Sequence, residues 1–324
     1  RAMIRTGSFS FHAASRALPV RVRDPSIALY AFCRVADDEV DEGQDKASAV
    51  LRLRDRLDLI YQGRPRNAPS DRAFASIVEE FEMPRALPEA LLEGLAWDSL
   101  ERRYDTLNEL KGYAARVAAS VGAMMCVLMR VRDPDVLARA CDLGLAMQMT
   151  NIARDVGEDA RAGRLFLPLE WLAALGVEPE QFLARPSASP QIRECTALLL
   201  REAAELYRRA SPGVAGLPFD CRMAIYAAGH VYAAIGSEVR RQDYNSVTTR
   251  ARTTSAHKMR LMALSALQAG ISTVTPMSPR LHARPDPEVA FLVDAASRRA
   301  VVSARSEALL GILQQLEARD RTSV

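Results

Sequence analysis

Two aspartate pairs with the same four-residue spacing constrain this chain more than any other feature of its sequence. They are Asp37/Asp41 and Asp155/Asp159, which lie far apart in the chain. In an α-helix, residues four apart lie one above the other on the same face. Two carboxylates placed so closely repel each other unless a cation lies between them. The spacing therefore predicts two helices, each with an acidic stripe, that face one another across a cation site.

Further polar side chains extend both stripes at helical spacing. Tyr30 and Arg34 precede the first pair, and Gln148 and Asn151 precede the second. The other faces of both segments are Leu, Ile, Met, Phe and Ala, so each stripe either faces solvent or lines a buried polar cavity. An isolated pair favours the solvated face, because like charges four residues apart cost only about a few tenths of a kcal/mol in water. The repetition of the pattern, without interleaved lysine, favours the cavity.

The ligand chemistry of the two pairs indicates the substrate class. Mg²⁺ takes hard oxygen ligands, commonly carboxylates together with substrate phosphates. Two facing pairs therefore predict a site that holds several Mg²⁺ or Mn²⁺ ions and a diphosphate group.

The composition fits a chain made almost entirely of helices. Apolar residues, many of them Ala and Leu, make up 49% of the 324 residues, whereas short alternating strand patterns are scarce. No linker, block of like charge or internal repeat divides the chain. We therefore expect a single all-α domain over residues 1–324. Helices are predicted over 8–16, 25–42, 46–62, 70–82, 88–104, 107–131, 134–159, 191–210, 218–244, 256–268 and 287–318.

Charge and cysteine usage limit the partners and the compartment. A net charge of only +3 argues against a nucleic-acid partner. The five cysteines are widely spaced, which predicts reduced thiols in a cytoplasmic protein. The longest apolar stretch, Val121–Met129, is too short to span a membrane. Peripheral contact with a membrane surface is compatible with a lipid substrate, but no basic-aromatic helix identifies a docking surface.

Several segments closely resemble the squalene/phytoene synthase family. They are residues 8–10, 28–42, 113–122 and 148–168, with family order and spacing kept to about Lys258. The most specific runs are LYAFCRVADD, which begins at Leu29, and NIARDVGEDARAGRLFLP, which begins at Asn151.

The resemblance implies both a fold and a reaction. The fold is an isoprenoid-synthase helical bundle with a central cavity. The chain would be a prenyltransferase that condenses two geranylgeranyl diphosphates head to head, through a cyclopropyl (prephytoene) diphosphate, to phytoene in carotenoid biosynthesis. That reaction needs no NADPH.

The resemblance also assigns roles to individual residues. Three tyrosines would line the cavity near the reacting carbons, and arginines would hold the diphosphates; the implied catalytic residues are Tyr30, Arg34, Tyr113, Arg154 and Tyr232. The implied substrate-binding residues are Arg5, Ser8, Arg34, Gln148, Arg154 and Arg250. The implied metal ligands are Asp37, Asp41, Asn151, Asp155 and Asp159. Gly7 stands where the family usually has lysine, so the N-terminal diphosphate contacts would come from Arg5 or from backbone N–H groups.

Two alternatives remain open at this stage. One is a C15 head-to-head synthase that makes squalene, dehydrosqualene or hydroxysqualene. The other is a non-catalytic family member that acts as an assembly factor. The apolar segments Val121–Met129 and Met147–Met149 adjoin the polar stripes and are expected to border the prenyl-tail tunnel, with Ala123 and Ala146 in its wall. The sequence does not indicate the oligomeric state.

Overall fold

The computed structural model describes residues 17–41, 46–274 and 278–298, and within these every regular element is a helix. The expected all-α class is therefore confirmed. The predicted helix at 8–16 lies outside the described residues, as do the side chains of Asp37 and Asp41. The α-helices are α3 (Val20–Asp41), α4 (Lys46–Tyr61), α5 (Pro69–Glu80), α6 (Ala86–Ser99), α7 (Leu107–Ala114), α8 (Ser120–Leu128), α9 (Pro134–Arg161), α10 (Leu169–Ala174), α11 (Pro179–Ala184), α12 (Pro190–Ala210), α13 (Phe219–Arg241), α14 (Ser255–Ile271) and α15 (Ala290–Ser297). Short non-α turns are η1 (Ala115–Ala119), η2 (Ser211–Gly216), η3 (Pro279–His282) and η4 (Pro287–Val289).

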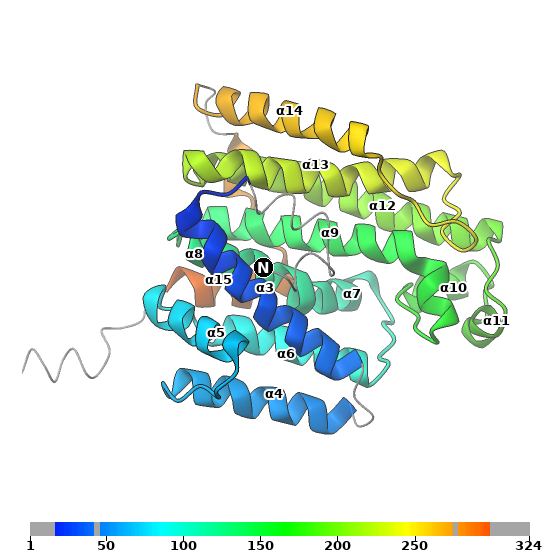
Figure 1. Cartoon of the computed structure of the whole chain (residues 1–324). Helices are drawn as coiled ribbons and strands as arrows, with labels where there is room; N and C mark the ends of the chain where they lie inside the picture. The colour runs from blue at the N-terminus through cyan, green and yellow to red at the C-terminus, as the bar shows by residue number, and fades with distance from the viewer. Residues whose placement is uncertain (1–16, 42–45, 275–277, 299–324) are drawn as a thin grey trace, which may run out of the picture.

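Helix α9 is the central element of the bundle (Figure 1). It begins with Asp133 as its N-cap, whose side chain accepts hydrogen bonds from the backbone N–H groups of Asp135 and Val136. Proline at the first helical position adds a preset φ angle. The helices α8, α12, α13 and α15 and the turns η1 and η2 all pack against α9. Residues on α9 therefore reach most of the interior of the protein.

The segment predicted as one helix over 107–131 contains a turn of π-helix. Residues Ala115–Ala119 form this turn between α7 and α8. A π turn holds one residue more than an α turn and is often found at functional sites. It lies where α9 approaches closely, because a Cβ atom added at Gly144 would lie 2.6 Å from the Cα atom of Ala119.

A fully buried ion pair fixes the segment after α14 to the bundle. The Nε atom of Arg139 lies 2.7 Å from a carboxylate oxygen of Asp142, and both side chains are inaccessible to solvent. The Nη1 atom of Arg139 donates hydrogen bonds to the carbonyl oxygens of Arg280, Leu281 and Ala283. This arginine therefore joins the first half of α9 to a segment much later in the chain.

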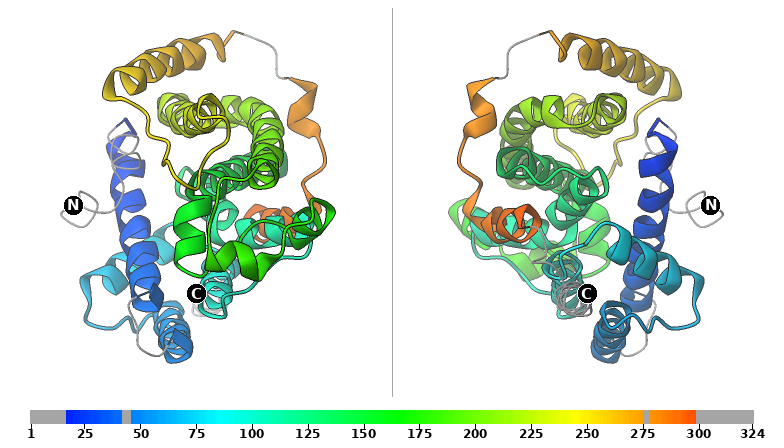
Figure 2. Two further views of the ribbon diagram at one scale, coloured as in Figure 1. Left: turned by 90° about the vertical axis from the view of Figure 1, so that its right-hand side faces the viewer. Right: turned by 90° about the vertical axis from the view of Figure 1, so that its left-hand side faces the viewer.

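Helix α14 forms an outer layer of the molecule. It packs against α13, which in turn packs against α9 (Figure 2). Among the described residues, no helix combines the length and apolar character that crossing a membrane requires. The five cysteines are free thiols.

Candidate active site

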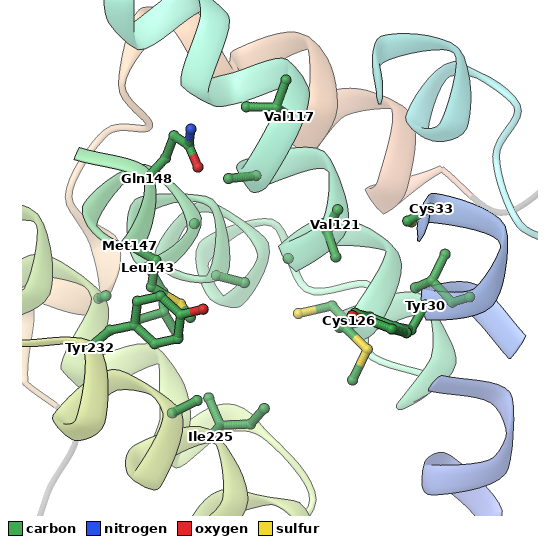
Figure 3. Close-up of a pocket in the computed structure, with 18 of the residues that line it drawn as sticks. Tyr30, Cys33, Val117, Val121, Cys126, Leu143, Met147, Gln148, Ile225 and Tyr232 are labelled. Atoms are coloured by element: carbon green, nitrogen blue, oxygen red, sulfur yellow. The ribbon is translucent and has the colours of Figure 1, made fainter. Parts of the chain in front are cut away.

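A cavity of about 550 Å³ lies inside the bundle (Figure 3). Its walls come from α3, α6, the α7–η1–α8 segment, α9 and α13. The central cavity implied by the resemblance is therefore present. Its size falls within the range of about 300–1,000 Å³ that is usual for ligand pockets.

One face of α9 runs along the whole cavity. The lining positions recur every three or four residues, as expected for one side of a helix. They are Val136, Arg139, Ala140, Leu143, Gly144, Met147, Gln148 and Asn151. From Val136 to Asn151, a rise of about 1.5 Å per residue gives a lined length of about 22 Å.

We call the part of the cavity beside Gln148 and Asn151 its polar end, and the remainder, which is lined mostly by apolar side chains, its apolar end. Tyr30 and Arg34 from α3 also line the cavity wall. Tyr232 on α13 and Tyr30 on α3 approach from opposite walls (Figure 3). Burial is the main cause that raises the pKa of Tyr232, and Tyr30 and Asp155 raise it further. The Tyr232 hydroxyl therefore stays protonated near neutral pH.

A third tyrosine, Tyr113, reaches the cavity from α7. The Tyr113 hydroxyl donates a hydrogen bond of 3.0 Å to Asp98 on α6, and both residues line the cavity. Burial and the Asp98 carboxylate raise the pKa of Tyr113 well above its ordinary value. The Tyr113 ring packs against Tyr104 and Phe166 with centroid distances of 5.3 Å. This packing fixes the ring, so the hydroxyl keeps its orientation toward Asp98.

Asp155 lies one helical turn beyond Asn151 and is held by two arginines. Arg154 binds it with both Nε, at 2.8 Å, and Nη2. Arg250 donates to the same carboxylate at 3.0 Å and lies 2.9 Å from Glu158. Arg250 belongs to the loop after α13, so folding brings together groups that are distant in sequence. Its position depends on Gly157, where an added Cβ atom would lie 2.4 Å from the carbonyl oxygen of Val247.

Asp159 completes the acidic stripe of α9. Its partner is Arg164, at a long 3.4 Å. Burial raises the pKa of Asp159 to about 6, with Asp155 and Glu158 adding to the effect and Arg164 opposing it. Crowded carboxylates with a raised pKa are the arrangement that a bound cation relieves.

The expected site residues that the structure describes fall into two groups. Six line the cavity: Tyr30, Arg34, Tyr113, Gln148, Asn151 and Tyr232. Four lie in or against the next turns of α9: Arg154, Asp155, Asp159 and Arg250. Arg5 and Ser8 lie outside the described residues, so their placement stays a prediction. The same holds for the side chains of Asp37 and Asp41, although both residues belong to the last turns of α3. In the part of the chain that the structure describes, no group of three or more His, Cys, Asp or Glu side chains is arranged to hold a metal ion.

Two of the expected tunnel-wall residues were placed wrongly from the sequence. Ala123 and Ala146 are fully buried in the core and do not line the cavity. Their neighbours do line it, among them Gly122 and Met147. Asp98 and the distal residues Arg139 and Val136 also line the cavity. Asp98 was visible in the sequence as a lone acid on an apolar helix, whereas the two distal residues could have been found only by following the α9 stripe toward its N-terminus.

Known proteins resemble this chain in amino-acid sequence. The family profile described as squalene/phytoene synthase matches residues 4–260. The chain belongs to the squalene/phytoene synthase family. A phytoene synthase of Rhodobacter capsulatus is 64% identical over 324 residues, covering 99% of this chain and 96% of the relative. A phytoene synthase of Cereibacter sphaeroides is 63% identical over 331 residues, covering 99% of this chain and 93% of the relative.

Solved structures of the same family agree with the fold. A crystal structure of a dehydrosqualene synthase matches with a TM-score of 0.76 and 31% identity, covering 83% of this chain and 95% of that protein. A squalene synthase from Alicyclobacillus acidocaldarius matches with a TM-score of 0.70 and 25% identity, covering 76% and 93%. The isoprenoid-synthase helical bundle expected from the sequence is therefore confirmed.

Proposed function

We propose that the chain is a prenyltransferase that condenses two molecules of geranylgeranyl diphosphate head to head to phytoene, in carotenoid biosynthesis. The two relatives reported above at 64% and 63% identity are phytoene synthases that align over nearly the whole chain. The C15 synthases among the solved structures are less similar, at 31% and 25% identity. The C20 reaction is therefore the better supported of the two head-to-head reactions.

The length of the cavity is the structural observation that carries this proposal. An isoprene unit places four carbon–carbon bonds of about 1.5 Å along the chain and spans roughly 5 Å when extended. A geranylgeranyl tail of four units then needs roughly 20 Å, and a farnesyl tail of three units needs roughly 15 Å. The lined length along α9, about 22 Å, accommodates the longer tail.

The residues around Asp155 suit a divalent cation. Asn151, Asp155 and Asp159 offer oxygen donors at successive turns of α9, and Mg²⁺ or Mn²⁺ takes such donors. We propose that Asp37 and Asp41 supply the other half of the ligand set from α3. Bound there, the cation would neutralise the diphosphate and make it a better leaving group.

The arginines and tyrosines of the site supply the remaining interactions. Arg34, Arg154 and Arg250 would bind diphosphate oxygens, assisted by Gln148 and, from the N-terminal segment, by Arg5 and Ser8. The aromatic faces of Tyr30, Tyr113 and Tyr232 would stabilise the allylic cation. The apolar walls exclude water, which would otherwise quench that cation.

The bond changes balance without a reductant. The first diphosphate ionises, a double bond of the second molecule captures the allylic cation, and loss of a proton closes the ring of the cyclopropyl diphosphate. Ionisation of this intermediate releases the second diphosphate, and rearrangement with loss of a second proton gives phytoene. The two released diphosphates accept the two protons.

The first prediction concerns redox. Purified protein supplied with geranylgeranyl diphosphate and Mg²⁺ should form phytoene at the same rate with and without NADPH, because the last step releases a proton instead of accepting hydride. Extracted products are identified by liquid chromatography with mass spectrometry. If the cyclopropyl diphosphate accumulates until NADPH is added, the protein is a squalene-type synthase.

The second prediction concerns the distal half of the cavity. Ala140 lines the cavity eleven residues before Asn151 on α9, or about 16 Å away. The Ala140→Phe substitution should block the space beyond a C15 tail. A mismatch between a substrate group and an apolar pocket costs roughly 1–3 kcal/mol, so the ratio of C15 to C20 turnover should rise by about tenfold. The measurement is turnover of labelled farnesyl and geranylgeranyl diphosphate in parallel.

The same substitution at Ala146 is the matched control, because it distinguishes a blocked cavity from an overpacked core. Ala146 is fully buried on the same helix but does not line the cavity. The Ala146→Phe substitution should overpack the core and lower the melting temperature, with both activities lost together. An unchanged C15-to-C20 ratio in stable Ala140→Phe protein would contradict the assignment of the tail region.

A further inference from the structure

The outward face of α14 is largely apolar, whereas the outward face of an ordinary surface helix is polar. Met259, Leu264, Leu267 and Ile271 are between 48% and 74% exposed. Together with Ala263 they form one broad side of the helix, which we call the α14 outer face. A surface helix normally presents charged and polar residues on its exposed side, so these exposed apolar residues need an explanation.

Two polar side chains of α14, those of Ser265 and Gln268, point toward the protein. Ser265 is fully buried, and its hydroxyl forms a 2.8 Å hydrogen bond with Nδ1 of His230 on α13. The amide of Gln268 donates to the hydroxyl of Ser211, at 3.4 Å. These hydrogen bonds hold α14 with Ser265 and Gln268 toward the protein, and this orientation leaves Met259, Leu264, Leu267 and Ile271 exposed.

The surrounding sequence is strongly cationic. No Asp or Glu occurs between Tyr244 and Pro285. Arg252, Lys258 and Arg260 precede or begin α14. An apolar helical face beside cations is the pattern that binds a membrane surface with anionic lipid headgroups. A protein partner with an apolar surface would not explain the absence of acidic residues.

The position of α14 connects this face with the cavity. Helix α14 covers the outer side of α13, while Ala224, Ile225 and Ala228 on the inner side of α13 line the cavity. Figures 1 and 2 show α14 lying along α13 at the periphery of the bundle. Under the proposed function, both the substrate tails and the C40 hydrocarbon product are insoluble in water. A membrane beside this wall shortens their transfer.

We propose that the α14 outer face docks on a lipid bilayer that contains anionic lipids, with Leu264, Leu267 and Ile271 in the interface and Arg260 against the headgroups. The partner follows from the charge and polarity of the segment. The argument from the product rests on the proposed function. The binding itself does not depend on turnover.

The test is co-sedimentation of the full chain with vesicles of phosphatidylcholine, with and without phosphatidylglycerol. Wild-type protein should sediment with the anionic vesicles. The Leu267→Glu substitution should lower the bound fraction at least about fivefold, because it places a charge in the interface. Leu51→Glu on α4 is the matched control, since Leu51 and Leu267 are both 61% exposed, and it should bind like wild type. Arg260→Glu should weaken binding to anionic vesicles, whereas Arg54→Glu, also exposed on α4, should not.

The outcomes that overturn the proposal are distinct. One is wild-type protein that sediments with neither kind of vesicle, and another is Leu267→Glu protein that binds as well as wild type. Light scattering gives the third: a wild-type dimer that Leu267→Glu converts to a monomer would mean that a second copy covers the face. Phytoene formation in detergent should be unchanged in Leu267→Glu protein. Loss of vesicle binding is thus distinguishable from failure of the proposed reaction.

Discussion

Replacing Asp155 with alanine should lower turnover of geranylgeranyl diphosphate by roughly a thousandfold or more, because groups that stabilise a departing anion contribute about two to three orders of magnitude each. Asp155 would bind the cation and also holds Arg154 and Arg250 in place. Its removal therefore affects both halves of the diphosphate site. The measurement is single-turnover product formation at saturating Mg²⁺.

Glu158 provides the matched control for this substitution. It lies on the same helix and is more than half exposed, and within the described part of the chain its ion-pair partner is Arg250. The Glu158→Ala substitution should change turnover by less than about tenfold, because exposed ion pairs contribute roughly 0–1 kcal/mol. The melting temperatures of both variants should stay near that of wild type. Asp155→Ala protein with turnover close to wild type would refute the proposed ligand set, as would full activity after removal of all divalent metal.

Replacing Arg139 with alanine should lower the free energy of unfolding by about 3–5 kcal/mol, since one partner of a buried ion pair is then left uncompensated. The substitution also removes the donor for three carbonyl groups of residues 280–283. Among the described residues, Asp142 would keep only Arg209 as an ion-pair partner, whose Nε atom lies 3.3 Å from the carboxylate. Urea unfolding followed by circular dichroism measures the loss.

The pH dependence of this variant has a definite sign. Burial already raises the pKa of Asp142 despite its two arginine neighbours. Without Arg139, the folded state should bind the Asp142 proton more tightly than the unfolded state does. Stability then falls as pH rises through the folded-state pKa, so the deficit relative to wild type should be larger at about pH 8 than at about pH 5. The double substitution of Arg139 and Asp142 by leucine should recover part of the loss, and a deficit independent of pH would contradict this account.

Long helices with clear boundary signals could be predicted from the sequence. The start of α9 at Pro134 follows from Asp133 and the proline, and the predicted end at Asp159 differs by two residues from the observed end at Arg161. Helix α3 begins at Val20, five residues before the predicted start, with Pro25 inside it. Buried Val22 and Leu29 on this helix gain packing energy that offsets the hydrogen bond lost at the proline.

Short and irregular elements could not be predicted in the same way. Helices α10 and α11 have six residues each, too few to show a hydrophobic period. The predicted helix from Pro287 instead begins as a turn of 3-10 helix, Pro287–Val289, followed by α15. The alanine-rich residues of η1 are compatible with an α-helix, so their sequence does not predict the π turn, which lies where α9 approaches closely.

The acidic stripe of α9 and the position of Tyr30 could be read from helical spacing, whereas Tyr113 and Tyr232 were implied only by the family resemblance. The contacts between elements could not be read from the sequence. Arg250 reaches Asp155 because the loop after α13 folds back onto Gly157, and only the family resemblance pointed to it. The α14 outer face could not be recognised either. Leu, Met and Ala occur all around that helix, so the sequence does not indicate which side is covered.

The π turn at Ala115–Ala119 gives this region an unusual sensitivity to changes in chain length. Deleting one residue there would restore a regular helix and rotate residues 107–114 by about 100° relative to α8. Tyr113 would turn away from Asp98, while Val121 and Met125 would keep their places along the apolar end of the cavity. A one-residue deletion at this point would thus alter the part of the cavity around Tyr113 and leave the apolar, tail-binding part intact. In an alignment of homologues, the length of this short stretch would carry more information about chemistry than the identity of its small residues.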